Sequence, residues 1–133
     1  MRRLATLVLL CAALSACSLA TDVKAAQLKV AHFHALLNAA NFDQIAAEAD
    51  PGMRWPTRGP SFKDYLSSVH RKLGFCGSWR MITFNEQLGI GGSVRINADT
   101  HCDADNAQES FVFNSGDLRL RGYAVTSRAL VVS

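Results

Sequence analysis

The residues best suited to acid–base or metal chemistry are four histidines, His32, His34, His70 and His101. His32 and His34 are two positions apart in a segment with helical periodicity, so their side chains point about 200° apart and cannot share a metal ion. No histidine or carboxylate lies at an offset that would complete a ligand set. His101 and Cys102 are neighbours in an expected strand and therefore point to opposite faces of its sheet. The histidines predict neither a metal site nor a cysteine–histidine pair.

Catalytic and cofactor motifs are also absent from the sequence. It contains no nucleophile elbow, P-loop, zinc motif or dinucleotide fingerprint. The glycines of "GIGGS" join two expected strands, so they indicate a turn and not a phosphate-binding loop. Asp43 and Asp64 lie at expected helix starts, where a capping role explains them. We therefore predict no catalytic residue, no metal and no cofactor.

The first 17 residues carry a different kind of chemistry. Arg2 and Arg3 precede a run, residues 4–14, that is almost wholly apolar and too short to span a bilayer. The next residues, Leu14-Ser15-Ala16-Cys17, resemble a bacterial lipobox. This resemblance implies cleavage before Cys17, a diacylglycerol thioether on its sulfur and acylation, for example by palmitate, of its new amino group. A plain secretory signal with an incidental cysteine is the alternative.

The residue after the cysteine suggests where such a protein would reside. Ser18 stands where an Asp would retain a Gram-negative lipoprotein at the inner membrane, so the resemblance implies the outer membrane, in the leaflet that faces the periplasm. Loss of Arg2 and Arg3 would leave 12 basic against 11 acidic residues. No cluster of Lys and Arg remains that would predict nucleic-acid binding.

The rest of the chain predicts one small domain. We expect a signal peptide over residues 1–16, a lipidated tether over 17–24 and a single domain over 25–133. Apolar residues recur at helical spacing over residues 25–40, and a short helix is expected over 42–49. Pro51-Gly52 ends the short helix, and a loop over residues 51–60 follows. A third helix over 62–73 begins at a Ser61 cap and ends at Gly74.

After Gly77 the spacing of the apolar residues changes from that of helices to that of strands. Residues 78–88 and 93–102 flank one turn, and residues 109–113 and 117–125 flank another. These features predict an α+β fold in which three N-terminal helices, long, short and medium, pack on a curved four-stranded antiparallel sheet.

This order of elements resembles the cystatin-like folds, and within them the nuclear transport factor two-like domains. The stretches "FKDYLSSVHRKLGFCGSW" and "ESFVFNSGDLRLRGYAVTSRAL" are also similar to small exported bacterial proteins of unknown function. The shared residues are structural, so the resemblance implies a fold but no activity. It also implies a cone between sheet and helices that can host a ligand or an acid–base pair, and an outer sheet face through which a homodimer can form.

Cys76 and Cys102 can pair only in some registers of the first hairpin. A two-residue turn at Gly91-Gly92 would place Cys102 opposite Met81, with Cys76 on the other face, and would exclude a disulfide. A longer loop from Gln87 to Gly91 would place Cys76 directly opposite Cys102. An oxidising compartment favours the bridge and turn chemistry favours its absence, so the sequence leaves both open.

These observations favour a non-catalytic envelope domain, held at the membrane by lipid on Cys17, that binds or scaffolds. Its expected partner is a protein or a small apolar ligand in the cone. The alternative is a small enzyme of the polyketide-cyclase or ketosteroid-isomerase type that uses an ionisable residue buried in a roomy cone.

Overall fold

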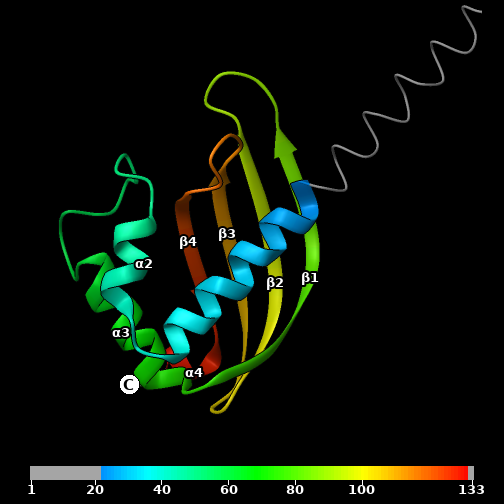
Figure 1. The fold of residues 1–133 in the computed structure, drawn as a ribbon. Coiled ribbons are helices and arrows are strands. Elements are labelled where there is room, and N and C mark those ends of the chain that lie inside the picture. The colour runs from blue at the N-terminus through cyan, green and yellow to red at the C-terminus, as the bar shows by residue number, and fades with distance from the viewer. Residues whose placement is uncertain (1–21, 132–133) are drawn as a thin grey trace, which may run out of the picture.

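The computed structural model describes residues 22–131 as a layer of helices on one face of a sheet (Figure 1). A long helix covers residues 22–38 and is followed by α2 (Phe42–Glu48) and α3 (Phe62–Leu73). The strands are β1 (Cys76–Gln87), β2 (Ser93–Cys102), β3 (Asn106–Asn114) and β4 (Leu120–Thr126). The predicted α+β class, with helices before an antiparallel sheet, is confirmed.

The long helix differs from its predicted bounds at both ends. It includes residues 22–24, which we expected in the tether, and its buried stripe begins one turn before Val30, at Ala26, and continues through Val30 and Phe33. It ends before Ala40, whose φ of 55° is left-handed. Two hydrogen bonds close this end, from the Ala40 amide to the Leu37 carbonyl and from the Asn41 amide to the Leu36 carbonyl, and together they form a Schellman motif.

The two shorter helices begin and end close to where the sequence predicts. The Asn41 side chain caps α2 by accepting from the Gln44 amide. Ser61 caps α3 by accepting from the Asp64 amide, and Gly74, with a φ of 73°, ends it. Trp55 in the intervening loop folds back onto α3, with ring centroids 4.9 Å from Phe62 and 5.1 Å from Tyr65.

The sheet is an antiparallel meander in the order β1-β2-β3-β4. Neither uniform register that we considered for its first hairpin is right. Gln87 pairs with Ser93 across a five-residue turn, and two irregularities in β1, between Met81 and Thr83 and between Cys76 and Ser78, each shift the register by one residue. A β-bulge adds one residue to one strand without disturbing its partner. The two shifts together bring Cys76 opposite Cys102.

The helices cover the concave inner face of the curved sheet (Figure 1). Alternate residues of β2 and β3 are buried on this face, where they meet the apolar stripes of the long helix and α3. A short helix that we did not predict, α4 (Arg128–Val131), follows β4. Its four residues are too few to show helical periodicity.

Candidate functional site

The three residues singled out as sites in the sequence have different outcomes. Cys17 lies outside the described residues, so its lipidation stays a prediction. Cys76 and Cys102 are both buried and joined by a disulfide bond, 26 residues apart in sequence. The bridge joins β1 to β2. It lies at the end of the sheet where the long helix ends, since the side chain of Asn38 hydrogen-bonds both backbone groups of Cys76.

A buried polar network lies in the cone between the sheet and the long helix. The Glu109 carboxylate accepts a hydrogen bond from His34 Nε2 at 2.7 Å and another from the Tyr123 hydroxyl at 2.6 Å. The Thr100 hydroxyl donates to the same carboxylate oxygen as His34. All four residues are less than 10% exposed. This is the arrangement of ionisable groups that an acid–base site in the cone would need.

Each member of this network is positioned by the periodicity of its element. Glu109 lies on β3 two residues before Phe111 and four before Phe113, so strand alternation turns it inward with them. His34 stands four residues after Val30 and three before Leu37 on the buried side of the long helix. Tyr123 on β4 is directly opposite Phe111. The network therefore joins one helix to three strands.

The network keeps Glu109 ionised. Burial raises the pKa of the carboxyl, but the hydrogen bond and charge of His34, together with the Thr100 and Tyr123 hydroxyls, outweigh burial and hold the pKa below its usual value. Burial raises the pKa of Tyr123 well above its usual value, and the Glu109 charge adds to this effect. The carboxylate is thus the charged acceptor, and the tyrosine stays a neutral donor.

Side chains fill the space around this network. Phe111 packs edge-on against Phe33, with ring centroids 5.1 Å apart, and lies 5.2 Å from the Tyr123 ring. The opening beside the long helix, lined by apolar residues such as Leu36 and Leu118 and by charged side chains such as Glu48, encloses only about 40 Å³, and none of the four network residues lines it. Ligand pockets begin at about 300 Å³. The Glu109 side chain itself is only 4% exposed, so in this conformation its own partners and the packed rings cover it.

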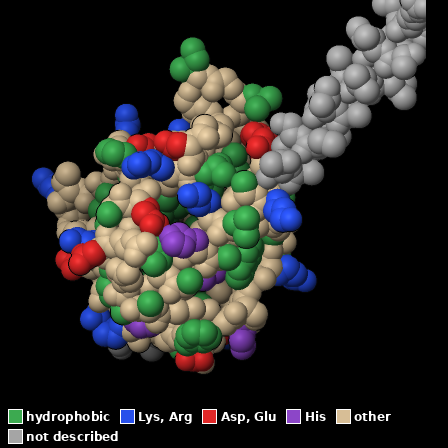
Figure 2. All heavy atoms as spheres, viewed as in Figure 1, with side chains coloured by type: hydrophobic (Ala, Val, Ile, Leu, Met, Phe, Trp, Pro, Cys, Tyr) green, Lys and Arg blue, Asp and Glu red, His purple; other side chains and the backbone are tan. Residues whose placement is uncertain are grey.

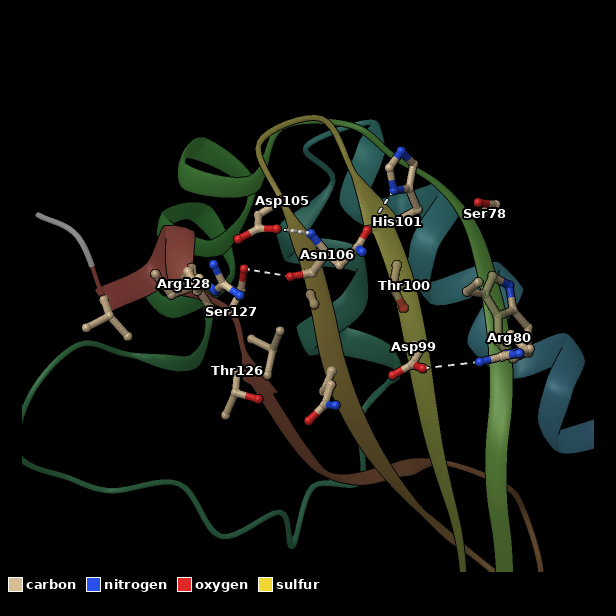
Figure 3. A pocket seen from close by; sticks show the side chains of 16 residues that line it. Ser78, Arg80, Asp99, Thr100, His101, Asp105, Asn106, Thr126, Ser127 and Arg128 are labelled. Atoms are coloured by element: carbon tan, nitrogen blue, oxygen red, sulfur yellow. Dashed lines mark hydrogen bonds and ion pairs between the residues drawn. The ribbon is translucent and has the colours of Figure 1, made fainter.

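The outer face of the same sheet offers much more space. A hollow of about 990 Å³ lies between β1, the end of the β2–β3 hairpin and α4 (Figure 3). A second hollow of about 380 Å³ adjoins it along the outer face, and Asp99, Gln108 and Thr126 line both. We call the two together the outer trough.

The outer trough is lined by polar groups that are paired but accessible. Arg80 Nη2 lies 3.5 Å from Asp99 Oδ2, and 78% of the Arg80 side chain is exposed. Asn106 is held on both sides: its side-chain oxygen lies 2.7 Å from His101 Nδ1, and its carbonyl accepts from the Ser127 hydroxyl at 2.8 Å (Figure 3). Hydroxyl, amide and balanced charged groups of this kind suit hydrogen bonding to a polar surface and not to a polyanion.

The sequence predicted neither the cone network nor the trough. Glu109 had a usable signal, because it shares the alternation of Phe111 and Phe113 and must face the core with them. Among residues 22–131, no group of three or more His, Cys, Asp or Glu is placed to hold a metal ion. Within the same range, no helix is long and apolar enough to cross a membrane.

No protein-family model, no curated protein and no solved structure matches the chain.

Proposed function

We propose that this protein is a lipid-anchored envelope protein of a Gram-negative bacterium whose α+β domain is a non-catalytic module that binds a protein partner. The Leu14-Ser15-Ala16-Cys17 pattern supports an anchor on Cys17 in the periplasmic leaflet of the outer membrane. The bridge between Cys76 and Cys102 is compatible with that address, because disulfides persist in the periplasm and are rare in the cytosol.

The observation that carries the non-catalytic assignment is the filled cone. The Glu109 carboxylate already accepts from three side chains and is 5% exposed, so its own partners cover it and substrate does not reach it in this conformation. The filling also argues against a small apolar ligand in the cone. A buried carboxylate that is hydrogen-bonded to several donors favours a single packing arrangement of the core, so its role is structural.

The outer trough is the surface that best suits a partner. It is long, it crosses all four strands, and its side chains can form hydrogen bonds without a change in the fold. The partner can be another protein or, as the cystatin-like resemblance implies, a second copy of this chain.

An enzyme of the polyketide-cyclase or ketosteroid-isomerase type is the second candidate. The His34–Glu109 pair favours it, because a carboxylate oriented by a histidine can act as a general base. That activity needs an open state of the cone in which the pair reaches substrate. Such a state would expose His34 and Glu109 to solvent, and hydrogen exchange along β3 would report it.

The anchor is tested by growing cells with labelled palmitate. The full chain should incorporate the label and sediment with outer membranes, and Cys17→Ser should lose both the label and the sedimentation. Incorporation that survives Cys17→Ser, or a wild-type protein without label, would contradict the anchor.

Binding through the trough is tested with a photo-crosslinking amino acid at Gln108, which is exposed on its floor. The matched control carries the same amino acid at Ala47, which is exposed on α2. We expect a discrete crosslinked species from residue 108 and none from residue 47. Equal crosslinking from both positions would contradict a binding surface confined to the trough.

A further inference from the structure

The turn between β1 and β2 presents two large apolar side chains to solvent. Leu88 is 85% exposed and Ile90 is fully exposed, whereas of the other large apolar residues in the described chain only Val131, beside Asp105 at the opposite end of the sheet, is comparably exposed. Figure 2 shows hydrophobic side chains standing clear of the body of the molecule at this tip. Apolar groups at the end of a projecting turn cannot serve the core of their own domain, so they indicate an external contact.

Hydrogen bonds from neighbouring residues hold the backbone of this turn in place. The Ser115 amide donates to the Gly92 carbonyl, and Arg121 Nη1 donates to the Gly91 carbonyl at 3.1 Å. Gly92 itself has no room for a side chain, since an added Cβ would lie 2.4 Å from the Gln87 carbonyl oxygen. These contacts fix the backbone conformation of the turn, and in this conformation Leu88 and Ile90 point into solvent.

The start of the long helix lies at the same end of the molecule as this tip. The helix runs antiparallel to β1, because Asn38 hydrogen-bonds Cys76 at the start of the strand and Gln27 contacts Met81 farther along it. Asp22 therefore lies toward the Gln87 end of β1, and Figure 1 shows the helix start and the turn at one end of the domain.

The chain before the helix is long enough, when fully extended, to bring Cys17 close to the level of the tip. From Gln27 to Asp22 the helix rises about 7 Å, and from Met81 to Leu88 the strand rises about 23 Å. Asp22 thus stands at least about 16 Å short of Leu88 along this direction, since the helix crosses the strands obliquely (Figure 1). The five residues from Cys17 to Asp22 span at most about 17 Å.

We propose that Leu88 and Ile90 insert into the leaflet that holds the acyl chains of Cys17, so that the domain meets the membrane at two points. This proposal rests on the lipid anchor proposed above. Basic and acidic groups nearly balance at this end, with Lys24, Arg95, Arg119 and Arg121 against Asp22, Glu86 and Asp117. The contact is therefore apolar and should persist at high salt.

A two-point contact would fix the orientation of the outer trough. The larger hollow of the trough is lined by Asp105, Asn106 and Ser127, which lie at the β2–β3 end of the sheet. The turn between β1 and β2 is at the opposite end, about 30 Å away along the ten residues of β2. With the tip in the bilayer, that hollow opens toward the periplasm, where a protein partner can reach it.

The test measures depth in vesicles with the mature, acylated protein. Cys76 and Cys102 are bridged and Cys17 carries lipid, so Ile90→Cys provides one thiol for an environment-sensitive fluorophore. The control is Ala39→Cys, exposed just beyond the far end of the long helix. The vesicles contain phosphatidylethanolamine and phosphatidylglycerol with a nitroxide-labelled lipid, and acylation is checked by mass on the same samples.

We expect quenching at residue 90 to be at least about twofold stronger than at residue 39, because an inserted apolar side chain reaches about 5–10 Å into the interface. Adding Leu88→Asn to the Ile90→Cys protein should reduce this quenching. Acylated protein with equal quenching at both positions, or with none at residue 90, would overturn the insertion and leave the anchor intact. Protein without acyl mass would overturn the anchor and the insertion that depends on it.

Discussion

The inner and outer faces of the sheet carry carboxylates on neighbouring strands and hold them in opposite ways. Glu109 on β3 faces the cone, is 5% exposed and accepts from His34, Thr100 and Tyr123. Asp99 on β2 faces the outer trough, has a side chain that is 45% exposed, and meets the guanidinium of Arg80 at 3.5 Å. The inner carboxylate is fixed by its partners, whereas the outer one can exchange its partner for a ligand.

This difference separates the chemistry of a residue from its use. A histidine, a glutamate and a tyrosine in one cone are the residue types of an active site, but here the carboxylate accepts from the other two and packed phenylalanines surround them. Only His34 Nδ1 is left buried without a hydrogen-bond partner among these three side chains. The outer face has fewer reactive groups and far more space. We infer that the cone network stabilises the fold and that the outer face supplies the binding surface.

The largest effect should come from breaking the cone network. Glu109→Ala leaves three buried donors without their acceptor, and the loss of one partner from a buried ion pair costs about 3–5 kcal/mol. The control is Ser110→Ala, one residue along the same strand on the outer face, which should change the free energy of unfolding by less than about 0.5 kcal/mol. Urea denaturation of the two variants and the wild type measures both values.

Equal free energies of unfolding for Glu109→Ala and Ser110→Ala would contradict the difference that we infer between the two faces. Tolerance of that change would mean that the cone does not depend on its carboxylate. The His34–Glu109 pair would then be better explained as a site kept for activity than as part of the core.

Loss of the disulfide should be the next largest effect. Cys76→Ser with Cys102→Ser frees a loop whose ends are 26 residues apart in sequence. The entropy of closing such a loop corresponds to about 3.5 kcal/mol in the free energy of unfolding. Thermal denaturation of the double variant, beside wild type with and without reductant, measures it. A reductant that destabilised the double variant as much as the wild type would contradict this origin.

A smaller effect should appear as a change in acid sensitivity. The pKa of Glu109 is lower in the folded protein than its ordinary value of 4.5, so the ionised carboxylate stabilises the fold above that pH and this contribution is lost as the pH falls through the folded pKa. Glu109→Gln keeps the shape but cannot ionise. We expect its free energy of unfolding to fall less steeply than that of the wild type between about pH 5 and pH 3. Parallel curves would show that other carboxylates account for the acid sensitivity.

The fold was predictable because its signals are periodic and local. Helical spacing identifies the stripe through Val30, Phe33 and Leu37, and a cap and a glycine bracket α3. The register of the first hairpin was not predictable, because the irregularities in β1 have no sequence signature here and only their sum brings Cys76 opposite Cys102.

The cone network was predictable only in part. Strand alternation places Glu109 inside with Phe111, and helical spacing places His34 on the buried stripe of its helix. Their meeting depends on how the long helix crosses the sheet, which no pattern within either element determines. The outer trough depends on the twist of four strands and on α4, so the sequence gives no local indication of it.

The smallest effect on stability should come from the outer trough, and it is the one that tests function. Arg80→Gln with Asp99→Asn removes an exposed ion pair, so the free energy of unfolding should change by less than about 0.5 kcal/mol. Arg119→Gln with Asp117→Asn is the matched control, because it removes another exposed pair, 4.0 Å apart, at a site outside the trough. If the trough binds a partner, crosslinking from Gln108 should weaken in the first double variant and remain in the control. Equal crosslinking in both would mean that the partner does not contact Arg80 and Asp99, and the interface would have to be sought on another face of the domain.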